Sequence, residues 1–250
     1  MNDRQKEILS LTQKRGEITI KELAMHMAVS EMTIHRDLDY LQGQKYLYKK
    51  RGAAVFVELP DRVRDGFYEK EKRAIACQVA RMLKPKQYVL FDNSTTVLEC
   101  AKQLDPSLAL TCYTTGIEST SVLSQKSGFV LHCSGGYFFP ESRGFIGDQT
   151  EKFVSTVYAD VCLIGASGIS VEGGVTTPYP PHSFLQKGII KVSGECWLVA
   201  DHSKFGKRAL DKIVGLSEVT QIITDSGISD RDYQQFSQYV KIVVAGDEKE

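Results

Sequence analysis

The sequence predicts two domains: a small, mainly helical domain at the N-terminus and a larger α/β domain with a parallel-rich sheet between flanking helices. In residues 1–57 apolar side chains first recur at helical spacing, and apolar and polar side chains then alternate in a short segment near the end. Over residues 74–250 helical segments alternate with continuously apolar runs, which is typical of strands covered on both faces. Residues 58–73 contain ten charged residues, a Pro and a Gly, so we expect a linker there.

Two helices are expected at the start of the N-terminal domain. Asp3 can cap a helix that runs to about Arg15, and Gly16 ends it. Thr19 can cap a second helix, IKELAMHM. A short turn then leads to the next helix.

A third helix and a β-hairpin complete this domain. Ser30 is a good N-cap for the helix EMTIHRDLDYLQGQ. One stripe of this helix recurs at core spacing and consists of Ile34, Leu38 and Leu41. The segment LYKKRGAAVFVEL then alternates around Gly52 as a hairpin does.

Two short helices, a tight turn and a basic hairpin indicate a winged helix-turn-helix that binds DNA. A helix fits the major groove, where exposed polar side chains meet base edges, and cations on a wing meet phosphates. The candidate DNA-binding residues are Ser30, Thr33, His35, Arg36, Lys49, Lys50 and Arg51. The same pattern also fits a small protein-docking module with a solvated charged face.

The larger domain is expected to alternate helices with strands. Helices are predicted at about residues 74–82 and 97–103. The strands are predicted at residues 88–92, 109–113, 129–133, 160–165, 196–200, 221–224 and 241–245. Such a sheet brings the carboxyl ends of its strands to one edge, where ligands bind.

Small polar residues or glycine follow most of these strands. Ser94, Thr95 and Thr96 open a helix and suit a phosphate, while Asp92 and Asp201 suit sugar hydroxyls. The other candidates at this edge are Thr115, Gly135, Gly136, Lys187 and Lys204, and the roles of His182 and His202 stay open. Turns after strands favour these residue types in any case.

Several other classes are not expected. GASGIS is not a dinucleotide fingerprint and no P-loop is present, so neither standard nucleotide site is expected. The six scattered Cys residues lie in apolar segments and indicate buried thiols, with no metal, cofactor or catalytic residue predicted. No apolar run has the length of a membrane helix and the polar start lacks a secretory segment, so a cytoplasmic protein is expected.

Charge is balanced overall but unevenly distributed. The chain of 250 residues has 31 basic and 31 acidic residues. Residues 1–57 carry ten Lys or Arg and seven Asp or Glu, a net charge of +3, which leaves −3 on the remainder. This excess is consistent with nucleic acid binding at the N-terminal end but is small.

Taken together, these segments resemble the DeoR family of bacterial transcription regulators. The similarity begins at VSEMTIHRDLDYLQ and the KKRGA hairpin. It continues through EKEKRAIACQVARML, FDNSTTVLECAKQL, CSGG, ADVCLIGASGIS, GGVTT and VADHSKFGK. The resemblance implies a repressor with a sensor domain similar to ribose-5-phosphate isomerase and CoA-transferase-like folds. It also implies binding of a phosphorylated sugar or related metabolite.

The resemblance implies that the DNA-binding residues given above belong to the recognition helix and the wing. It also adds Thr177 to the residues of the effector pocket. Three departures stand out: His35 replaces a common Arg, Ser94 replaces a common Gly, and His182 stands where an acidic residue is common. We expect the first to change the operator sequence, the second to change how the phosphate loop approaches its ligand, and the third to bear on the identity of the effector.

We therefore expect a DNA-binding repressor of carbohydrate genes, released by a phosphorylated sugar-type effector. Its partners would be double-stranded operator DNA and, because one small winged domain buries little surface, at least a second copy of the chain. The alternative is a sugar-phosphate isomerase with an accessory N-terminal domain, in which Asp92 or His182 would act as general base.

Overall fold

The N-terminal domain of this computed structural model has three helices and a small antiparallel sheet. The structure describes residues 1–43, 46–50, 52–56 and 68–246, and the chain divides into two compact units, residues 1–67 and 68–250. The first unit contains α1 (Asp3–Arg15), β1 (Glu17–Thr19), α2 (Ile20–His26), α3 (Glu31–Gly43), β2 (Leu47–Lys50) and β3 (Ala53–Phe56). These are the helices and wing of a winged helix-turn-helix.

Capping residues set the helix starts in this domain. The predicted cap at Thr19 is confirmed, because its hydroxyl accepts from the Glu22 N–H in a capping box. The predicted cap at Asp3 is wrong by one residue, because Asn2 forms the capping box with Gln5 and Asp3 lies inside the first turn. Strand β1, which has three residues and pairs with β3, was not predicted from the sequence.

The core of the domain includes the predicted stripe of α3. Ile34, Leu38 and Leu41 are fully buried. A carboxylate shares this buried side: Asp37 accepts from Arg4 Nε at 2.6 Å and from Gln5 Nε2 at 2.9 Å. The two hydrogen bonds therefore fix α3 against the first turn of α1.

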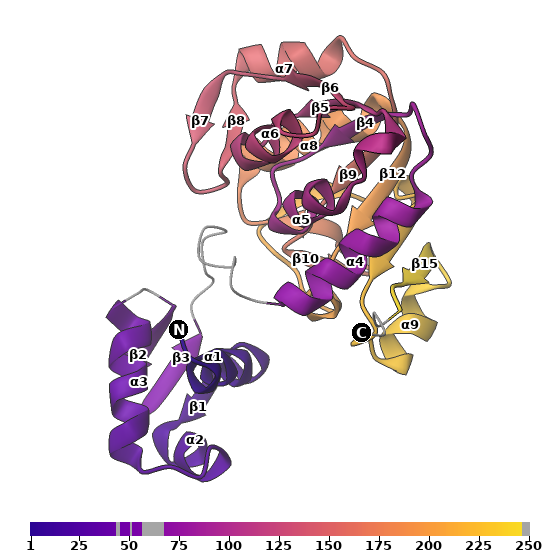
Figure 1. The fold of residues 1–250 in the computed structure, drawn as a ribbon. Helices are drawn as coiled ribbons and strands as arrows, with labels where there is room; N and C mark the ends of the chain where they lie inside the picture. The colour runs from indigo at the N-terminus through magenta and orange to yellow at the C-terminus, as the bar shows by residue number, and fades with distance from the viewer. Residues whose placement is uncertain (44–45, 51, 57–67, 247–250) are drawn as a thin grey trace. The chain divides into compact units, whose positions relative to one another are not determined.

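The second unit is a three-layer α/β/α domain around a seven-stranded sheet (Figure 1). Its strands run in the order β15-β14-β12-β9-β4-β5-β6, and all neighbouring pairs are parallel. They are β4 (Tyr88–Phe91), β5 (Thr111–Thr114), β6 (Val130–Cys133), β9 (Ala159–Ile164), β12 (Ser193–Val199), β14 (Gln221–Thr224) and β15 (Lys241–Val244). The predicted parallel sheet is confirmed, with strand boundaries shifted by up to three residues.

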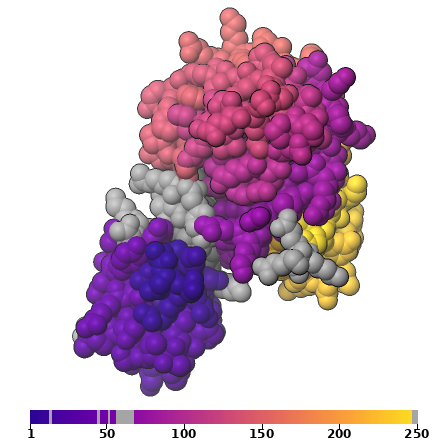
Figure 2. Space-filling model, in the orientation of Figure 1, coloured from indigo at the N-terminus to yellow at the C-terminus, as the bar shows by residue number. Residues whose placement is uncertain are grey.

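Helices cover both faces of this sheet. On one face α4 (Glu69–Met82), α5 (Thr95–Gln103) and α6 (Ile117–Ser124) pack on alternate strand residues such as Phe91 and Leu163. Figure 2 shows the purple and magenta surface of these helices closing that face. On the other face α7 (Asp148–Ser155), α8 (Pro180–Lys191) and α9 (Asp230–Phe236) contribute to the core around Leu90 and Ile164.

Smaller elements flank the sheet. A hairpin is formed by β7 (Tyr137–Phe139) and β8 (Gly144–Ile146), and an antiparallel sheet by β10 (Gly168–Ser170), β11 (Gly174–Thr177) and β13 (Asp211–Val214). Three single-turn 3₁₀ helices are η2 (Pro106–Leu108), η3 (His202–Lys204) and η4 (Leu216–Glu218). These five strands were not predicted from the sequence.

Three expectations need correction. Residues 69–73, assigned to the linker, form the start of α4, because their charged side chains occupy the solvent side of an amphipathic helix. Strand β6 is mostly exposed rather than covered, because it is the last strand of the sheet. Cys133 at its end is therefore exposed and Cys77 is half-buried, whereas Cys100, Cys112, Cys162 and Cys196 are buried as predicted.

We predict that Asp37→Asn lowers the free energy of local opening of α3 by about 1.5 to 3 kcal/mol, because hydrogen bonds to a buried charged group are of that size. Hydrogen exchange of the α3 amides measures this change. Asp39→Asn is the matched control on the same helix: its side chain is 63% exposed, so the cost is below about 1 kcal/mol. Equal effects of the two variants would contradict the anchoring role of Asp37.

Candidate functional site

The N-terminal end of α3 presents short polar side chains. Ser30 Oγ accepts from the Thr33 N–H at 3.3 Å and lies 3.0 Å from Thr33 Oγ1. Ser30 is exposed and Thr33 is half-buried. The Ser30 hydroxyl therefore caps the helix, and a contact of either hydroxyl with DNA would use the lone pairs or proton that remain.

The rest of the recognition helix exposes a mixed surface. Arg36 is exposed and His35 is half-buried. Met32 and Tyr40 on the same helix are 66% and 44% exposed, so apolar area lies beside the charged side chain. In the major groove, polar side chains contact base edges and apolar side chains contact thymine methyl groups.

The lysines of the wing are paired with carboxylates, so their positive charge is partly neutralised. Lys49 Nζ lies 2.5 Å from Asp39 of α3, and its backbone N–H donates to Gln42 Oε1 at 2.7 Å. Lys50 Nζ lies 3.7 Å from a Glu17 carboxylate oxygen. A phosphate contact by either lysine would therefore require that it leave its carboxylate partner, and Arg51 lies outside the described residues.

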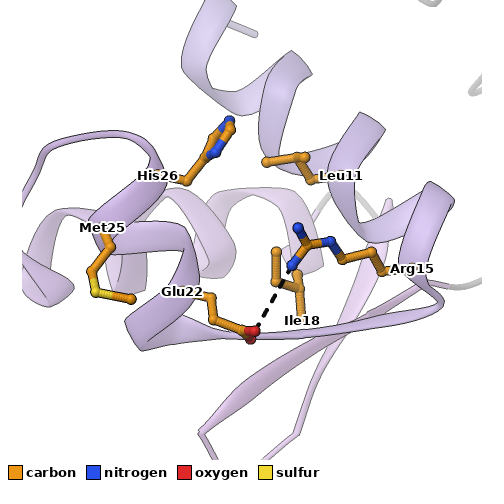
Figure 3. Close-up of a pocket in the computed structure, with 6 residues that line it drawn as sticks. All are labelled: Leu11, Arg15, Ile18, Glu22, Met25 and His26. Carbon is orange, nitrogen blue, oxygen red and sulfur yellow. Dashed lines mark ion pairs between the residues drawn. The ribbon is translucent and has the colours of Figure 1, made fainter.

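A groove of about 340 Å³ lies on another side of this domain, between α1, β1 and α2 (Figure 3). It is lined by Leu11, Arg15, Ile18, Glu22, Met25 and His26. Arg15 pairs with Glu22 at 3.8 Å, and His26 with Glu7 at 3.1 Å. None of the predicted DNA-binding residues lines it.

The predicted ligand edge of the large sheet has its centre at Asp92. Strand order reverses direction between β4 and β9, and Asp92 follows β4 directly. This carboxylate is fully buried and accepts from the N–H groups of Ser94 at 2.7 Å and Gly165 at 2.8 Å, and from Gln186 Nε2 at 2.8 Å. Such a reversal of strand order is where open α/β sheets bind ligands.

The start of α5 adjoins this carboxylate. Ser94 is the N-cap, and its hydroxyl accepts from the Val97 N–H at 3.3 Å. Because the Ser94 N–H is bonded to Asp92, the donors that this turn can offer an anion are those of Thr95 and Thr96. Thr96 is buried and Thr95 is half-buried.

The next two strands bring Thr115, Gly135 and Gly136 to the same edge. Thr115 is fully buried after β5. The two glycines follow β6 with φ of +59° and +112°, and a Cβ at Gly136 would lie 2.3 Å from Thr150 Oγ1. The positive φ favours glycine at both positions, and Gly136 also lacks room for a Cβ. The two residues lie two strands, about 10 Å, from Asp92.

On the other side of Asp92, Asp201 lies two residues after the end of β12. Asp201 caps η3, and its Oδ2 lies 3.7 Å from Lys204 Nζ. Burial alone raises the pKa of this carboxyl, but Lys204, Ser203 and Lys72 outweigh that effect and hold the pKa below its ordinary value. Asp201 is therefore a buried charge that Lys204 compensates.

The remaining predicted residues divide between buried and exposed positions. Thr177 is buried at the end of β11. Lys187 is exposed on α8, while the preceding residue, Gln186, faces Asp92 and also donates to the Gly165 carbonyl at 3.1 Å. Gln186 thus occupies the position that sequence reasoning gave to Lys187, and only the burial pattern of α8 reveals it.

Buried polar atoms without a hydrogen-bond partner lie after several strands of this edge and on α8. Within the described residues they include Asn93 Oδ1, Thr115 Oγ1, Gln186 Oε1, Asp201 Oδ2, Ser203 Oγ and both ring nitrogens of His182. A buried polar atom without a partner costs about 1 to 3 kcal/mol, so such a group is typical of a site that binds a polar ligand or water.

The described part of the chain contains neither a candidate metal site nor a candidate membrane-spanning helix. No cluster of three or more His, Cys, Asp or Glu side chains is arranged to hold a metal ion. No helix there has the length and apolar character needed to cross a bilayer.

A winged helix-turn-helix joined to an α/β domain with a polar reversal point defines a DNA-binding transcriptional regulator with a sensor domain. Residues 4–59 match the model of the DeoR-like helix-turn-helix domain, and residues 68–226 match the DeoR C-terminal sensor domain. The chain belongs to the DeoR family, as its sequence indicated.

Two relatives agree with this class. The chain is 33% identical to the transcriptional repressor AccR of Agrobacterium fabrum, with 90% of each chain covered. It is 30% identical to the glycerol-3-phosphate regulon repressor of Escherichia coli, with 88% of each covered. Ribose-5-phosphate isomerase A of Methanocaldococcus jannaschii aligns at 12% identity over 55% of each chain, with a TM-score of 0.42. The regulator family, rather than an isomerase, accounts for both domains.

We predict a pH-dependent contribution from His202 and Asp225, whose Nδ1 and Oδ2 lie 2.7 Å apart. The hydrogen bond to Asp225 raises the pKa of His202 above 6.5; despite burial, the bonds from His202 hold the pKa of Asp225 below 3.8. The pair's stabilisation is therefore complete between about pH 4 and 6.5 and falls as pH rises through the raised pKa of His202.

Asp225→Asn should lower the free energy of unfolding by about 1.5 to 3 kcal/mol at pH 5.5, and by less at pH 9. Denaturant unfolding followed by the fluorescence of Trp197 measures both values. A loss that is the same at the two pH values would show that the pair carries no proton-linked stabilisation.

Proposed function

We propose that the protein represses genes of carbohydrate use and that a phosphorylated sugar or related metabolite releases it from operator DNA. Residues 1–57 would bind DNA, and residues 74–250 would bind the effector. The single observation that carries this proposal is the set of buried, unpartnered polar atoms at the reversal point beside Asp92. The relatives named as repressors, one of them of a glycerol-3-phosphate regulon, support the direction of control.

The effector's anionic group would sit at the start of α5. Thr95 and Thr96 supply N–H groups there, and Lys204, two strands away beside Asp201, supplies positive charge. Asp92 would then orient the loop rather than touch the ligand, since its oxygens already accept three hydrogen bonds. Gly135, Gly136 and Thr177 would shape the edges of the pocket.

The signal would leave the sensor through η3 and α4. The Tyr68 ring, at the start of α4, packs edge-on against the His202 ring with centroids 5.4 Å apart. Lys72, one turn further, is buried and lowers the pKa of Asp201. An effector that draws Lys204 from Asp201 would thus alter the contacts of the helix that follows the linker.

DNA binding would use at least a dimer. A single winged domain buries too little surface for tight, specific binding, and two copies match the two halves of an operator. A regulator works in the compartment that holds its DNA, which supports the cytoplasmic location expected from the sequence.

For the DNA site, we predict that Arg36→Ala reduces operator binding more than binding to unrelated DNA, because Arg36 meets a base edge. Lys50→Ala should weaken both alike and flatten the salt dependence of log K by about one unit, because one phosphate contact is lost. Fluorescence anisotropy across a salt series measures both effects. An unchanged salt slope for Lys50→Ala would remove the wing from the interface.

Asp39→Asn provides the converse test on the same surface. It removes the carboxylate that holds Lys49, so binding to any DNA should tighten. Weaker binding would mean that the Lys49–Asp39 pair positions the wing instead.

For the effector site, we predict that Thr95→Val and Lys204→Ala bind the operator as the wild type does but need at least about tenfold more effector for release. A charge-assisted hydrogen bond is worth roughly 1.5 to 3 kcal/mol, which gives this factor. Titration of phosphorylated sugars into a preformed protein–DNA complex measures it. Release of both variants at the wild-type concentration would place the phosphate elsewhere.

A further inference from the structure

His182 is a buried imidazole that the protein itself does not use. His182 is 5% exposed, and neither of its ring nitrogens has a hydrogen-bond partner among the described residues. An imidazole ring can donate from one nitrogen and accept at the other, so two bonds are left unmade. Buried polar side chains of this kind are normally satisfied, which points to a missing polar partner.

His182 lies on the same helix, α8, as Gln186, whose side chain contacts the reversal point. His182 and Gln186 are four residues apart and therefore share one face of the helix. Gln186 Nε2 donates to Asp92 and to the Gly165 carbonyl, which fixes that face beside the ends of β4 and β9.

The direction of α8 places His182 beyond the strands. The helix leads into β12, which begins at the opposite edge of the sheet, so α8 runs antiparallel to the strands. His182 is one turn before Gln186, about 6 Å further along the axis at 1.5 Å per residue. It therefore lies above the carboxyl edge, on the side where a ligand of the sheet binds.

The hairpin β7–β8 helps to cover the start of α8. Phe139 of β7 packs edge-on against Tyr179, the residue that precedes this helix, with ring centroids 6.1 Å apart. The first turn of α8 is thus held between the sheet and the hairpin, which is consistent with the burial of His182.

The unmade bonds define the chemistry of the partner. Gln186 donates both recorded bonds from Nε2, and its Oε1 remains an acceptor without a donor. His182 offers one donor and one acceptor. A hydroxyl group donates and accepts, and so satisfies both side chains, whereas an ionised phosphate has only acceptors to offer.

We propose that His182 and Gln186 form a hydroxyl-reading subsite and that His182 determines which hydroxylated phosphate the sensor accepts. This inference rests on the proposed function, because it assigns the second end of the same pocket. The anionic end lies at Thr95, Thr96 and Lys204, and the hydroxyl-bearing carbon chain extends from it toward α8. His182 is a specificity residue for binding and has no part in chemistry.

The test is calorimetric titration of the full chain with inorganic phosphate, glycerol 3-phosphate, ribose 5-phosphate and fructose 6-phosphate. The wild type should bind at least one of the three organic phosphates more tightly than inorganic phosphate. His182→Leu should weaken that binding at least about tenfold while inorganic phosphate changes by less than about twofold, and His182→Gln should recover part of the loss. Lys191→Ala, an exposed change on the same helix, should match the wild type.

Thermal unfolding of the ligand-free protein separates this role from a structural one. Because His182→Leu removes unpartnered polar atoms, its Tm should be equal to or above that of the wild type. A Tm lowered by several degrees with unchanged ligand binding would make His182 a structural residue and overturn the inference. Equal weakening for inorganic phosphate and for the sugar phosphate would overturn it as well. A wild type that binds none of the four probes would overturn the proposed function, and the subsite with it.

Discussion

The arrangement of the sensor domain depends on the buried carboxylate of Asp92. An isolated charge in the interior is very costly, so its three hydrogen-bond donors must stay in place. They come from the start of α5, the turn after β9 and the side chain of Gln186 on α8. One side chain therefore joins both halves of the sheet and a helix at the point where strand order reverses. Gly165 is part of this constraint, because a Cβ there would lie 2.4 Å from Ser94 Oγ.

In the DNA-binding domain, too, a buried carboxylate holds helices together. The ion pairs at its surface are weaker. Asp37 fixes α3 to α1 inside the domain, whereas Asp39 and Glu17 hold the wing lysines only at the surface. Exposed ion pairs contribute little, so replacing these carboxylates by DNA phosphates costs little. The small net charge of the domain is then compatible with DNA binding, because wing lysines that are paired at the surface could exchange a carboxylate for a phosphate.

Much of this fold follows from local sequence signals. The seven strands of the large sheet were predictable because each lies in an apolar run, and the caps at Thr19 and Ser30 because their side chains bond the next turn. The short strands β1, β7 and β8 were not, since three residues carry too little pattern. In the site, the polar residues that follow each strand could be predicted from the sequence. Which of them are buried and which are exposed could not. Lys187 is exposed and Gln186 is buried, and only packing of α8 on the sheet decides between neighbouring residues.

Hydrogen exchange of the full chain, with and without a sugar phosphate that releases the operator, tests the central claim most directly. The claim is that the effector binds at the reversal point of the sheet. The account predicts slower exchange of the amides at the start of α5, residues 95–98, and in η3, residues 202–205. Protection confined to the groove between α7 and α8, which is lined by Tyr158 and Phe184, would contradict it.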